Sequence, residues 1–386
     1  MDILSRNIES ILPSKEELQK KLAQKKPLRV KLGIDPTGPK IHIGRAVAFW
    51  KLREFQDAGH TIVLIFGDFT ARIGDPSDKE ERRPVLSKED IEENAKNYLS
   101  QIGRILNTKK VELHFNSEWH DKMSEADLIK LSRLLTVNQM LSRRNFSERF
   151  RAQKEIGIDE FLYPLLQGYD SVAIKSDIEL GGSDQLFNLK AGRILQQAYG
   201  QEPQLIMTTN MLWGLDGRKM STSWGNVVNI TDEPAEMFGK LMSLRDELMA
   251  DYLKLATRLA EKEMKKIEAL KNPKEKKERL ALEVVALYHG KSAALKAKKE
   301  FERVFSEKKL PAEILEVRLP KGSYNPIDLL LKARLASSKS EARRLVEQKG
   351  ICIDENVLES PRQTIELKNP IILSKGKRHF VKIIPK

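Results

Sequence analysis

One segment combines histidine, arginine and glycine in a pattern suited to binding phosphate. It runs from Asp35 to Arg45 (DPTGPKIHIGR) and lies between an apolar stretch and a helical pattern. At such a place the first N–H groups of a helix, and its dipole, favour a phosphate. His42 can donate a hydrogen bond to that phosphate, and Arg45 can hold a phosphate or a ribose. Gly33 and Gly44 would let a nucleotide approach the backbone closely. The alternative is an ordinary turn with a solvated histidine and arginine.

Two further segments carry groups that suit a nucleotide. The sequence DGRKMSTS at 216–223 is a turn dipeptide followed by cations and hydroxyls, which suits a polyphosphate. The sequence GGSDQ at 181–185 directly follows an apolar stretch. There Asp184 could hold ribose hydroxyls, and Gln185 offers both a donor and an acceptor. Taken singly, these segments could equally be a solvated loop and a plain β-turn.

A third feature is a polar face on an expected helix. Tyr163, Gln167 and Asp170 are spaced i, i+4 and i+7, so a helix would place all three on one side. A purely structural helix would be apolar there. Such a line of polar groups is typical of a ligand site or a buried network.

The elements that must position these residues alternate between strands and helices. Residues 28–34 (LRVKLGI) and 61–66 (TIVLIF) are typical of buried strands, and 43–58 predicts a helix that ends at Gly59. Another strand is expected at 174–180. The succession predicts an α/β fold with a doubly wound parallel sheet and right-handed crossovers.

Composition and capping signals divide the chain into four parts. After residue 230 the strand signal vanishes and the sequence becomes rich in Lys, Glu, Leu and Ala. Helix starts are expected at Asn325-Pro326 and at Ser338, which has Glu341 three residues on. A helix start is also expected at Ser87, with Asp90 at capping-box spacing. The expected parts are an α/β domain at 1–230, a helical domain at 231–318, a linker at 319–324 and a small α+β domain at 325–386.

The charge balance favours a polyanionic partner. The chain has 386 residues, with 68 Lys and Arg against 55 Asp and Glu, a net charge of +13. Residues 323–386 alone hold 13 basic and 7 acidic residues, a net of +6. The single cysteine, Cys352, excludes an intramolecular disulfide and a cysteine-cluster metal site. With no long apolar run and no signal-peptide pattern, we expect a cytoplasmic protein that does not insert into membranes.

The motifs together resemble a known family. HIGR at 42–45 and KMSTS at 219–223 resemble the HIGH and KMSKS signatures of class I aminoacyl-tRNA synthetases. The contexts KLGIDPTGPKIHIGR, LLQGYDSVAI and DIELGGSDQ are similar to those of bacterial tyrosyl-tRNA synthetases. The stretch ARLASSKSEARRLVEQKG with KGKRHF resembles the S-four-like RNA-binding domain that ends those enzymes. The resemblance covers essentially the whole chain. It implies a Rossmann-like catalytic domain, a helical anticodon-region domain and an RNA-binding domain.

The resemblance also implies roles for individual residues. The residues implied in catalysis are His42, Arg45, Lys219 and Thr222. Those implied in ATP binding are Gly33, Asp35, Thr37, Gly44, Asp184, Met211, Leu212, Met220, Ser221 and Ser223. Those implied in tyrosine binding are Asp75, Tyr163 and Gln167 for the ammonium, Gln185 for the carboxylate and Asp170 for the phenol. Those implied in RNA binding are Lys339, Arg343, Arg344, Lys349, Lys375, Lys377 and Arg378.

The implied reaction needs no tightly bound cofactor or metal site. ATP would enter as a substrate with Mg²⁺, L-tyrosine would be activated to tyrosyl-adenylate, and tRNA(Tyr) would receive the tyrosyl group. The resemblance further implies a homodimer. Three positions depart from the family pattern. Arg45 replaces the second histidine of HIGH, and Thr222 replaces the second lysine of KMSKS. Lys31 stands where some relatives have a tyrosine that shares the substrate phenol.

Other functions compete with this hypothesis. A tryptophanyl-tRNA synthetase shares the fold and similar motifs, but the basic C-terminal domain and the Tyr163, Gln167 and Asp170 pattern argue against it. A nucleotidyltransferase of the same superfamily would not need the basic tail. An RNA-binding protein that has lost catalysis would account for the altered motifs, but it would have no use for Asp75, Gln167 and Asp170 together.

Overall fold

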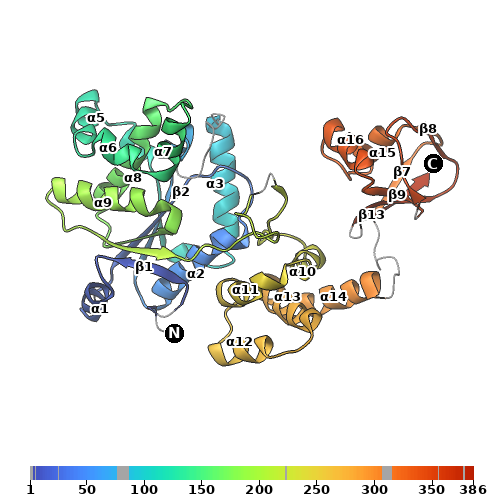
Figure 1. The fold of residues 1–386 in the computed structure, drawn as a ribbon, viewed down its shortest axis with the longest axis horizontal. Helices are drawn as coiled ribbons and strands as arrows, with labels where there is room; N and C mark the ends of the chain where they lie inside the picture. Colours follow the sequence, from blue (N-terminus) through green and yellow to red (C-terminus); the bar gives the residue numbers. More distant parts are fainter. Residues whose placement is uncertain are drawn as a thin grey trace. The chain divides into compact units, whose positions relative to one another are not determined.

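A computed structural model describes residues 3–4, 6–24, 26–75, 87–221, 224–306, 315–354, 356–376 and 379–386 (Figure 1). The chain forms two compact units. The first contains residues 1–232 and 244–276, and the second contains residues 233–243 and 277–386. The expected boundary at 230 therefore differs from the structure, because residues 244–276 pack with the first unit. None of the described helices combines the length and apolarity that crossing a membrane requires.

The first unit is built on a six-stranded sheet. Its strands are β1 (Ile8–Leu12), β2 (Arg29–Ile34), β3 (Thr61–Phe66), β4 (Val111–Phe115), β5 (Ile178–Gly182) and β6 (Leu205–Thr209). The spatial order is β1-β6-β5-β2-β3-β4, and all neighbours are parallel except β1 and β6. This confirms the doubly wound parallel sheet. The chain leaves β2 toward β3 and later returns to β5 on its other side. The ends of β2 and β5 therefore mark the switch point at which such sheets bind ligands.

Helices flank this sheet. They are α1 (Lys15–Ala23), α2 (Ile43–Asp57), α3 (Lys88–Ile102), α4 (Ser117–His120), α5 (Glu125–Ser132), α6 (Val137–Leu141), α7 (Arg144–Arg151), α8 (Ile158–Ile174), α9 (Leu186–Ala198), α11 (Met249–Ala256) and α12 (Glu261–Glu268). Ser87 caps α3 as expected, accepting a bond of 3.1 Å from the Asp90 N–H. α8 and α9 lie side by side (Figure 1). Gly168 and Gly192 allow this close packing, since a Cβ on Gly168 would lie 3.1 Å from the α9 backbone.

The expected strand at 174–180 begins four residues late. α8 continues through Ile174 and ends at Lys175, which adopts the left-handed conformation with φ of 52°. β5 then starts at Ile178. Lysine has no intrinsic preference for this conformation, so nothing local in the sequence marks the end of the helix.

The second unit begins with helices. They are α10 (Pro234–Met242), α13 (Pro273–His289), whose first residues belong to the first unit, and α14 (Lys291–Phe301), followed by a π-helical turn at Glu302–Ser306. Phe238 of α10 and Phe301 of α14 pack with their ring centroids 5.5 Å apart. No strand lies in the described residues from 233 to 306, as expected for a helical region.

The C-terminal part is a small α+β domain. Its elements are β7 (Leu315–Leu319), β8 (Gly322–Tyr324), α15 (Pro326–Lys332), α16 (Lys339–Glu347), β9 (Ile351–Ile353), β10 (Asn356–Val357), β11 (Ile365–Leu367), β12 (Ile371–Lys375) and β13 (His379–Pro385). Asn325 and Ser338 cap the two helices as expected. The boundary differs, however. β7 pairs in parallel with β13, and β8 pairs with β11, so residues 315–324 belong to this domain and not to a helical segment and a linker.

Candidate active site

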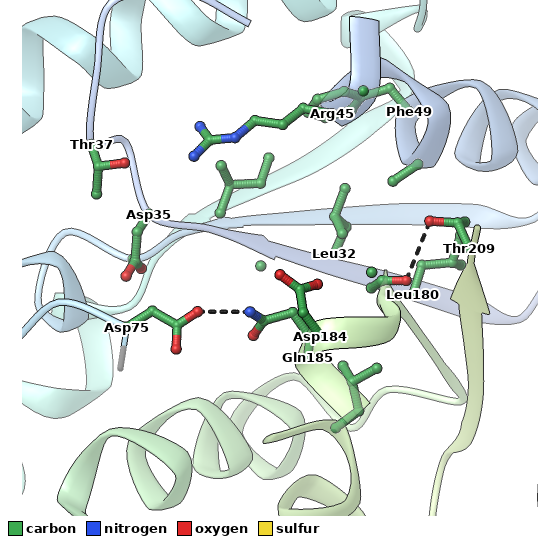
Figure 2. Close-up of a pocket in the computed structure, with 18 of the residues that line it drawn as sticks. Leu32, Asp35, Thr37, Arg45, Phe49, Asp75, Leu180, Asp184, Gln185 and Thr209 are labelled. Carbon is green, nitrogen blue, oxygen red and sulfur yellow. Dashed lines mark hydrogen bonds between the residues drawn. The ribbon is translucent and has the colours of Figure 1, made fainter. Parts of the chain in front are cut away.

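A cavity of about 340 Å³ opens at the switch point between β2 and β5 (Figure 2). It brings together residues that are far apart in the sequence. The residues expected to bind ATP or tyrosine, or to act in catalysis, that line it are Gly33, Asp35, Thr37, His42, Gly44, Arg45, Asp75, Tyr163, Gln167, Asp170, Asp184, Gln185, Met211, Leu212, Lys219 and Met220. Ser221 is described but does not line the cavity. Thr222 and Ser223 lie outside the described residues.

His42 closes the N-terminus of α2. Its Nδ1 accepts a hydrogen bond of 3.2 Å from the backbone N–H of Arg45. Burial, followed by the charges of Arg45 and Lys219, lowers the pKa of His42 to about 3. The ring is therefore neutral at physiological pH, and since Nδ1 accepts, Nε2 carries the proton. His42 thus offers a neutral N–H donor beside the unpaired backbone donors of the helix start.

Arg45 is held by an aromatic residue from another helix. Its guanidinium donates to the hydroxyl of Tyr98 on α3 and lies 5.9 Å from the centre of that ring. Tyr98 itself is 1% exposed and lines the cavity. The arginine that departs from the family motif therefore has a fixed partner, which the sequence analysis did not identify.

The two motif segments touch each other through Met220. A Cβ placed on Gly44 would lie 2.8 Å from Met220 Sδ and 3.1 Å from His42 Nδ1, so a larger residue there would require Met220 or His42 to shift. Next to it, Lys219 Nζ lies 2.9 Å from Asp184 Oδ2 in an ion pair. A cation and the expected ribose ligand thus share one edge of the cavity.

Asn226 holds the described part of the cationic loop in place. Its Nδ2 donates to Asp216 Oδ1 at 2.8 Å and to the Lys219 carbonyl at 3.0 Å. Its Oδ1 accepts from the Ser221 N–H at 2.8 Å. These bonds fix the backbone on both sides of Met220. Asn226 is a positioning residue that the motif alone did not indicate.

Four carboxylates line the same cavity, and three of them, Asp35, Asp75 and Asp170, influence one another. Asp35 accepts hydrogen bonds of 2.8 Å from both Thr70 Oγ1 and the Tyr163 hydroxyl. Burial raises the pKa of Asp35 to about 7, with smaller contributions from Asp75 and Asp170, and the two hydrogen bonds oppose the rise. Such a concentration of negative charge suits an ammonium group.

Gln185 extends this acidic cluster on the β5 side of the cavity. Its Nε2 donates to Asp75 Oδ2 at 2.7 Å, as Figure 2 shows. Its Oε1 accepts from Asn188 Nδ2 at 3.0 Å. Asp75 and Gln185 were expected to hold opposite ends of an amino acid, and the structure places them in direct contact.

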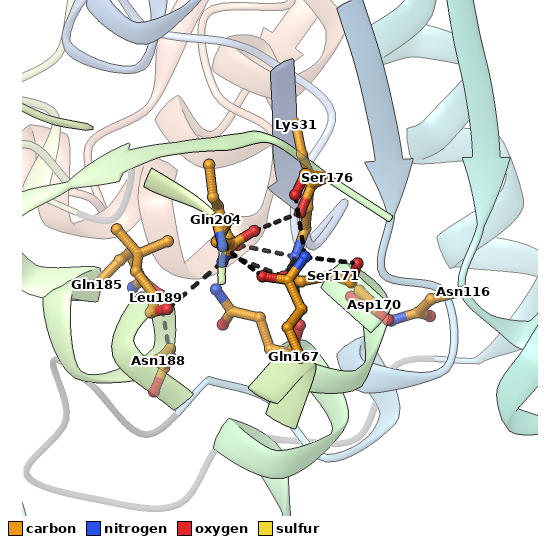
Figure 3. A network of polar contacts seen from close by, with 12 residues as sticks. Lys31, Asn116, Gln167, Asp170, Ser171, Ser176, Gln185, Asn188, Leu189 and Gln204 are labelled. Atoms are coloured by element: carbon orange, nitrogen blue, oxygen red, sulfur yellow. Dashed lines mark hydrogen bonds and ion pairs between the residues drawn. The ribbon is translucent and has the colours of Figure 1, made fainter. Parts of the chain in front are cut away.

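Asp170 is surrounded by donors. It is 3% exposed, and its Oδ1 receives Trp119 Nε1 at 2.9 Å and lies 3.0 Å from His120 Nε2. Asn116 Nδ2 lies 3.5 Å from Oδ2 (Figure 3). All three donors come from the segment that follows β4. The helical spacing indicated Asp170 but none of these partners, because they lie about fifty residues away and form no periodic pattern.

Lys31 is absent from the residues that line the cavity. It is completely buried, and its ammonium lies 2.8 Å from Glu179 Oε1 and 2.8 Å from Ser171 Oγ (Figure 3). Lys31 and Glu179 are direct neighbours on the parallel strands β2 and β5. Gln204 donates to the other oxygen of Glu179. A buried polar network thus joins these strands to α8 beneath the cavity.

The residues expected to bind RNA divide into two groups. Lys339, Arg343, Arg344 and Lys349 are exposed on or beside α16, whose opposite face buries Ala342 and Val346. The ammonium of Lys375 is instead bound within the domain. It lies 2.9 Å from Glu341 Oε1 and 3.1 Å from the Leu335 carbonyl. Lys377 and Arg378 lie outside the described residues.

The described residues contain no group of three or more His, Cys, Asp or Glu side chains arranged to hold a metal ion. The cavity offers acceptors for an ammonium, and a neutral histidine and helix N–H groups for a phosphate. At its edge, the ion pair of Lys219 with Asp184 supplies a cation that could bind a phosphate instead. The arrangement suits a reaction between an amino acid and a nucleotide.

Two family models match the chain. The model described as tRNA synthetases class I (W and Y) matches residues 23–306, and the model of the S4 domain matches residues 326–369. A tyrosine–tRNA ligase of Thermotoga maritima is 50% identical over 99% of this chain and 96% of its own. That of Aquifex aeolicus is 44% identical over 96% and 94%. Among solved structures, a tyrosyl-tRNA synthetase from Archaeoglobus fulgidus complexed with L-tyrosine shares the fold, with a TM-score of 0.62 and 24% identity over 76% of this chain and 97% of the other.

Proposed function

Because the chain belongs to the class I tRNA synthetases of the W and Y family, we propose that it is a tyrosine–tRNA ligase. The observation that carries the choice of amino acid is Asp170, a buried carboxylate on the wall of the cavity that also contains His42 and Lys219. A buried acceptor needs a donor, and the phenol of tyrosine supplies one. Phenylalanine would leave the acceptor unpaired, at a cost of about 1–3 kcal/mol from desolvation alone.

Tyrosine binds with its ammonium among the carboxylates. Asp35 and Asp75 supply negative charge, and Tyr163 and Gln167 supply polar atoms on the same wall. The Oε1 of Gln167 is buried and has no hydrogen-bond partner among the described residues, so it is ready to accept from a ligand. Gln185 stands near the substrate carboxylate. The amino acid is thereby oriented with its carboxylate toward the nucleotide.

ATP binds along the start of α2 and the edge of β6. Gly33, Thr37 and Gly44 shape the phosphate side, Met211 and Leu212 contact adenine, and Asp184 contacts the ribose. When ATP enters, the ammonium of Lys219 exchanges its partner Asp184 for pyrophosphate oxygens, and Met220 keeps the cationic loop against α2. Magnesium enters with ATP, bound to its phosphates, as this cation commonly binds in nucleotide enzymes.

The first step joins the two substrates. A carboxylate oxygen of tyrosine attacks the α-phosphorus of ATP, the bond to the bridging oxygen breaks, and pyrophosphate leaves with that electron pair. Tyrosyl-adenylate remains in the cavity. No side chain forms a covalent bond, so the rate depends on orientation and on stabilising the charge of the phosphate. His42 contributes a neutral donor, while Arg45 and Lys219 contribute positive charge.

The second step transfers the tyrosyl group. The terminal ribose hydroxyl of tRNA(Tyr) attacks the tyrosyl carbonyl carbon, AMP leaves, and the hydroxyl proton passes to the released phosphate or to solvent. The tRNA is held by the exposed cations of α16, whose contacts with phosphates do not depend on base sequence. Replacing Arg343 and Arg344 by Ala is expected to lower tRNA affinity and to reduce its salt dependence by about two phosphate contacts. Exchange without tRNA should be unchanged, whereas an unaltered salt slope would contradict this role.

The working protein is a homodimer in the cytoplasm, where its tRNA and ATP substrates are found. Large apolar side chains are exposed along the segment from α5 to α8: Ile129 at 57%, Val137 at 60%, Phe150 at 64% and Ile158 at 81%. Exposed apolar groups collected on one segment favour an interface. Ile158→Asp is expected to shift the protein from dimer to monomer in analytical ultracentrifugation. A wild-type monomer at micromolar concentration would refute the assignment.

Pyrophosphate–ATP exchange tests the function directly. The assay is run without tRNA, with tyrosine, tryptophan or phenylalanine in parallel, and is followed by aminoacylation of tRNA(Tyr). Exchange with tyrosine alone would support both the reaction and the substrate. Exchange with tryptophan would move the chain to the other branch of its family. A folded protein that gives no exchange but binds tRNA would favour the RNA-binding alternative.

A further inference from the structure

His120 does not line the cavity, but it contacts Asp170, which does. It is the last residue of α4, directly after Trp119, and its side chain is completely buried. Its ring contacts two aromatic residues, with its centroid 5.2 Å from that of Phe69 and 6.0 Å from that of Tyr169. The imidazole therefore has a fixed position, with Nε2 3.0 Å from Asp170 Oδ1.

The hydrogen-bond pattern determines which nitrogen of His120 carries the proton. A carboxylate oxygen can only accept, so Nε2 must donate to Asp170. The other nitrogen, Nδ1, is buried and has no hydrogen-bond partner within the part of the chain that the structure describes. A second proton there would be a buried donor without an acceptor. His120 thus aims a single donor, Nε2, at Asp170.

The two carboxylate oxygens of Asp170 therefore differ in the hydrogen bonds that they receive. Oδ1 receives two short N–H bonds, from Trp119 at 2.9 Å and from His120 at 3.0 Å. Oδ2 has only the long contact of 3.5 Å from Asn116 among the described residues. Two donors on one oxygen fix the rotation of the carboxylate, and they leave the second oxygen with unused capacity to accept.

We infer that His120 is a positioning residue for substrate selection, because it locks Asp170 so that Oδ2 accepts the phenol of tyrosine. The inference rests on the proposed function. Recognition of the tyrosine hydroxyl then depends on three residues and not on the Asp170 carboxylate alone. They are Asp170 on α8 and its donors Trp119 and His120 on α4. Without the His120 bond the carboxylate can rotate, and its acceptor is no longer held where the phenol arrives.

The test compares two variants and a matched control. His120→Phe keeps an aromatic ring but removes the donor, and His120→Gln keeps an N–H at a similar reach. The control is His114→Phe. The ring of His114 contacts that of Trp119, with centroids 5.9 Å apart, but His114 bonds to Glu118 and not to Asp170. Each protein is assayed by pyrophosphate–ATP exchange for KM of tyrosine, KM of ATP and kcat. Phenylalanine is added as a competitive inhibitor to obtain its Ki.

His120→Phe is expected to raise the KM for tyrosine about tenfold, the effect of losing one hydrogen bond to a charged group. The KM for ATP, kcat and the Ki of phenylalanine should stay within about twofold. His120→Gln should recover most of the loss, and the control should match wild type. Should His120→Phe fail to fold, His120→Asn, whose amide is too short to reach Asp170, replaces it.

Equal weakening of tyrosine and phenylalanine binding would overturn the inference, because it would show a general packing role. An unchanged KM for tyrosine in a folded variant would overturn it as well. Wild-type protein that gives no exchange with tyrosine would instead overturn the proposed function, and the inference with it. The two failures are therefore distinguishable in one set of measurements.

Discussion

The pKa of Asp35 predicts how tyrosine binding depends on pH. Burial, and then the charges of Asp75 and Asp170, raise this pKa to about 7, although Thr70 and Tyr163 donate to the carboxylate. An ammonium brought beside Asp35 favours its ionised form, so tyrosine binding requires the proton to leave. Tyrosine affinity is full above about pH 7 and is lost as the pH falls through that value.

The size of the effect follows from the same pKa. One pH unit below it, only about one Asp35 in eleven is ionised, so the KM for tyrosine should be about tenfold higher at about pH 6 than at about pH 8. The KM for ATP should change much less. His42 adds no titration in this range, since its pKa is lowered to about 3.

Pyrophosphate–ATP exchange at saturating ATP, measured across this pH range, gives the KM for tyrosine directly. Asp35→Asn is the informative variant, because the amide keeps the shape but cannot ionise. It should bind tyrosine weakly at every pH, with the dependence between about pH 6 and 8 removed. A variant that kept the wild-type slope would assign the titration to another group. A wild-type KM that did not vary with pH would refute the argument about Asp35 altogether.

Three other perturbations have defined outcomes. Gly44→Ala places a Cβ 2.8 Å from Met220 Sδ. Such overpacking costs about 1–3 kcal/mol and should raise the KM for ATP about tenfold. A variant with the KM of wild type would contradict the packing of the two motifs. Lys219→Ala should slow tyrosine activation about a hundredfold in pyrophosphate exchange, whereas an unchanged rate would show that the lysine is not used. Lys31→Met leaves Glu179 buried without its cation, so the free energy of unfolding measured by chemical denaturation should fall by about 3–5 kcal/mol. Adding Glu179→Met should recover most of that loss. If the single and double variants were equally unstable, the ion pair would be excluded as the cause.

Local sequence patterns were sufficient to predict the first strands and the helix that form the nucleotide site. α2, β2 and β3 match the expected segments to within a residue, because their apolar periodicity and the glycine after the helix are local signals. β4 and β6 were not predicted, since each is only five residues long and neither stands out from its surroundings. The antiparallel strand β1 was missed for the same reason.

Motif spacing selected residues that line one cavity, but it did not predict the contacts between them. Motif spacing identified the polar groups, and the cavity collects nearly all of them that the structure describes. The bond from Tyr163 to Asp35 joins residues 128 positions apart, and Arg45 reaches Tyr98 from another helix. Such pairs depend on how β2, α3 and α8 pack, which no window of sequence contains.

The buried position of Lys31 bears on how the proposed function selects tyrosine through Asp170 and its donors. A lysine on the wall of the cavity would place a cation beside a phenol and would weaken the discrimination against other rings. Instead, its ammonium is completely buried and paired with Glu179 on the neighbouring strand. This pairing removes position 31 from the substrate. Under the proposed function, Asp170 then recognises the hydroxyl. Because one carboxylate can rotate, we expect its orientation to depend on the bonds that Trp119 and His120 make to its Oδ1.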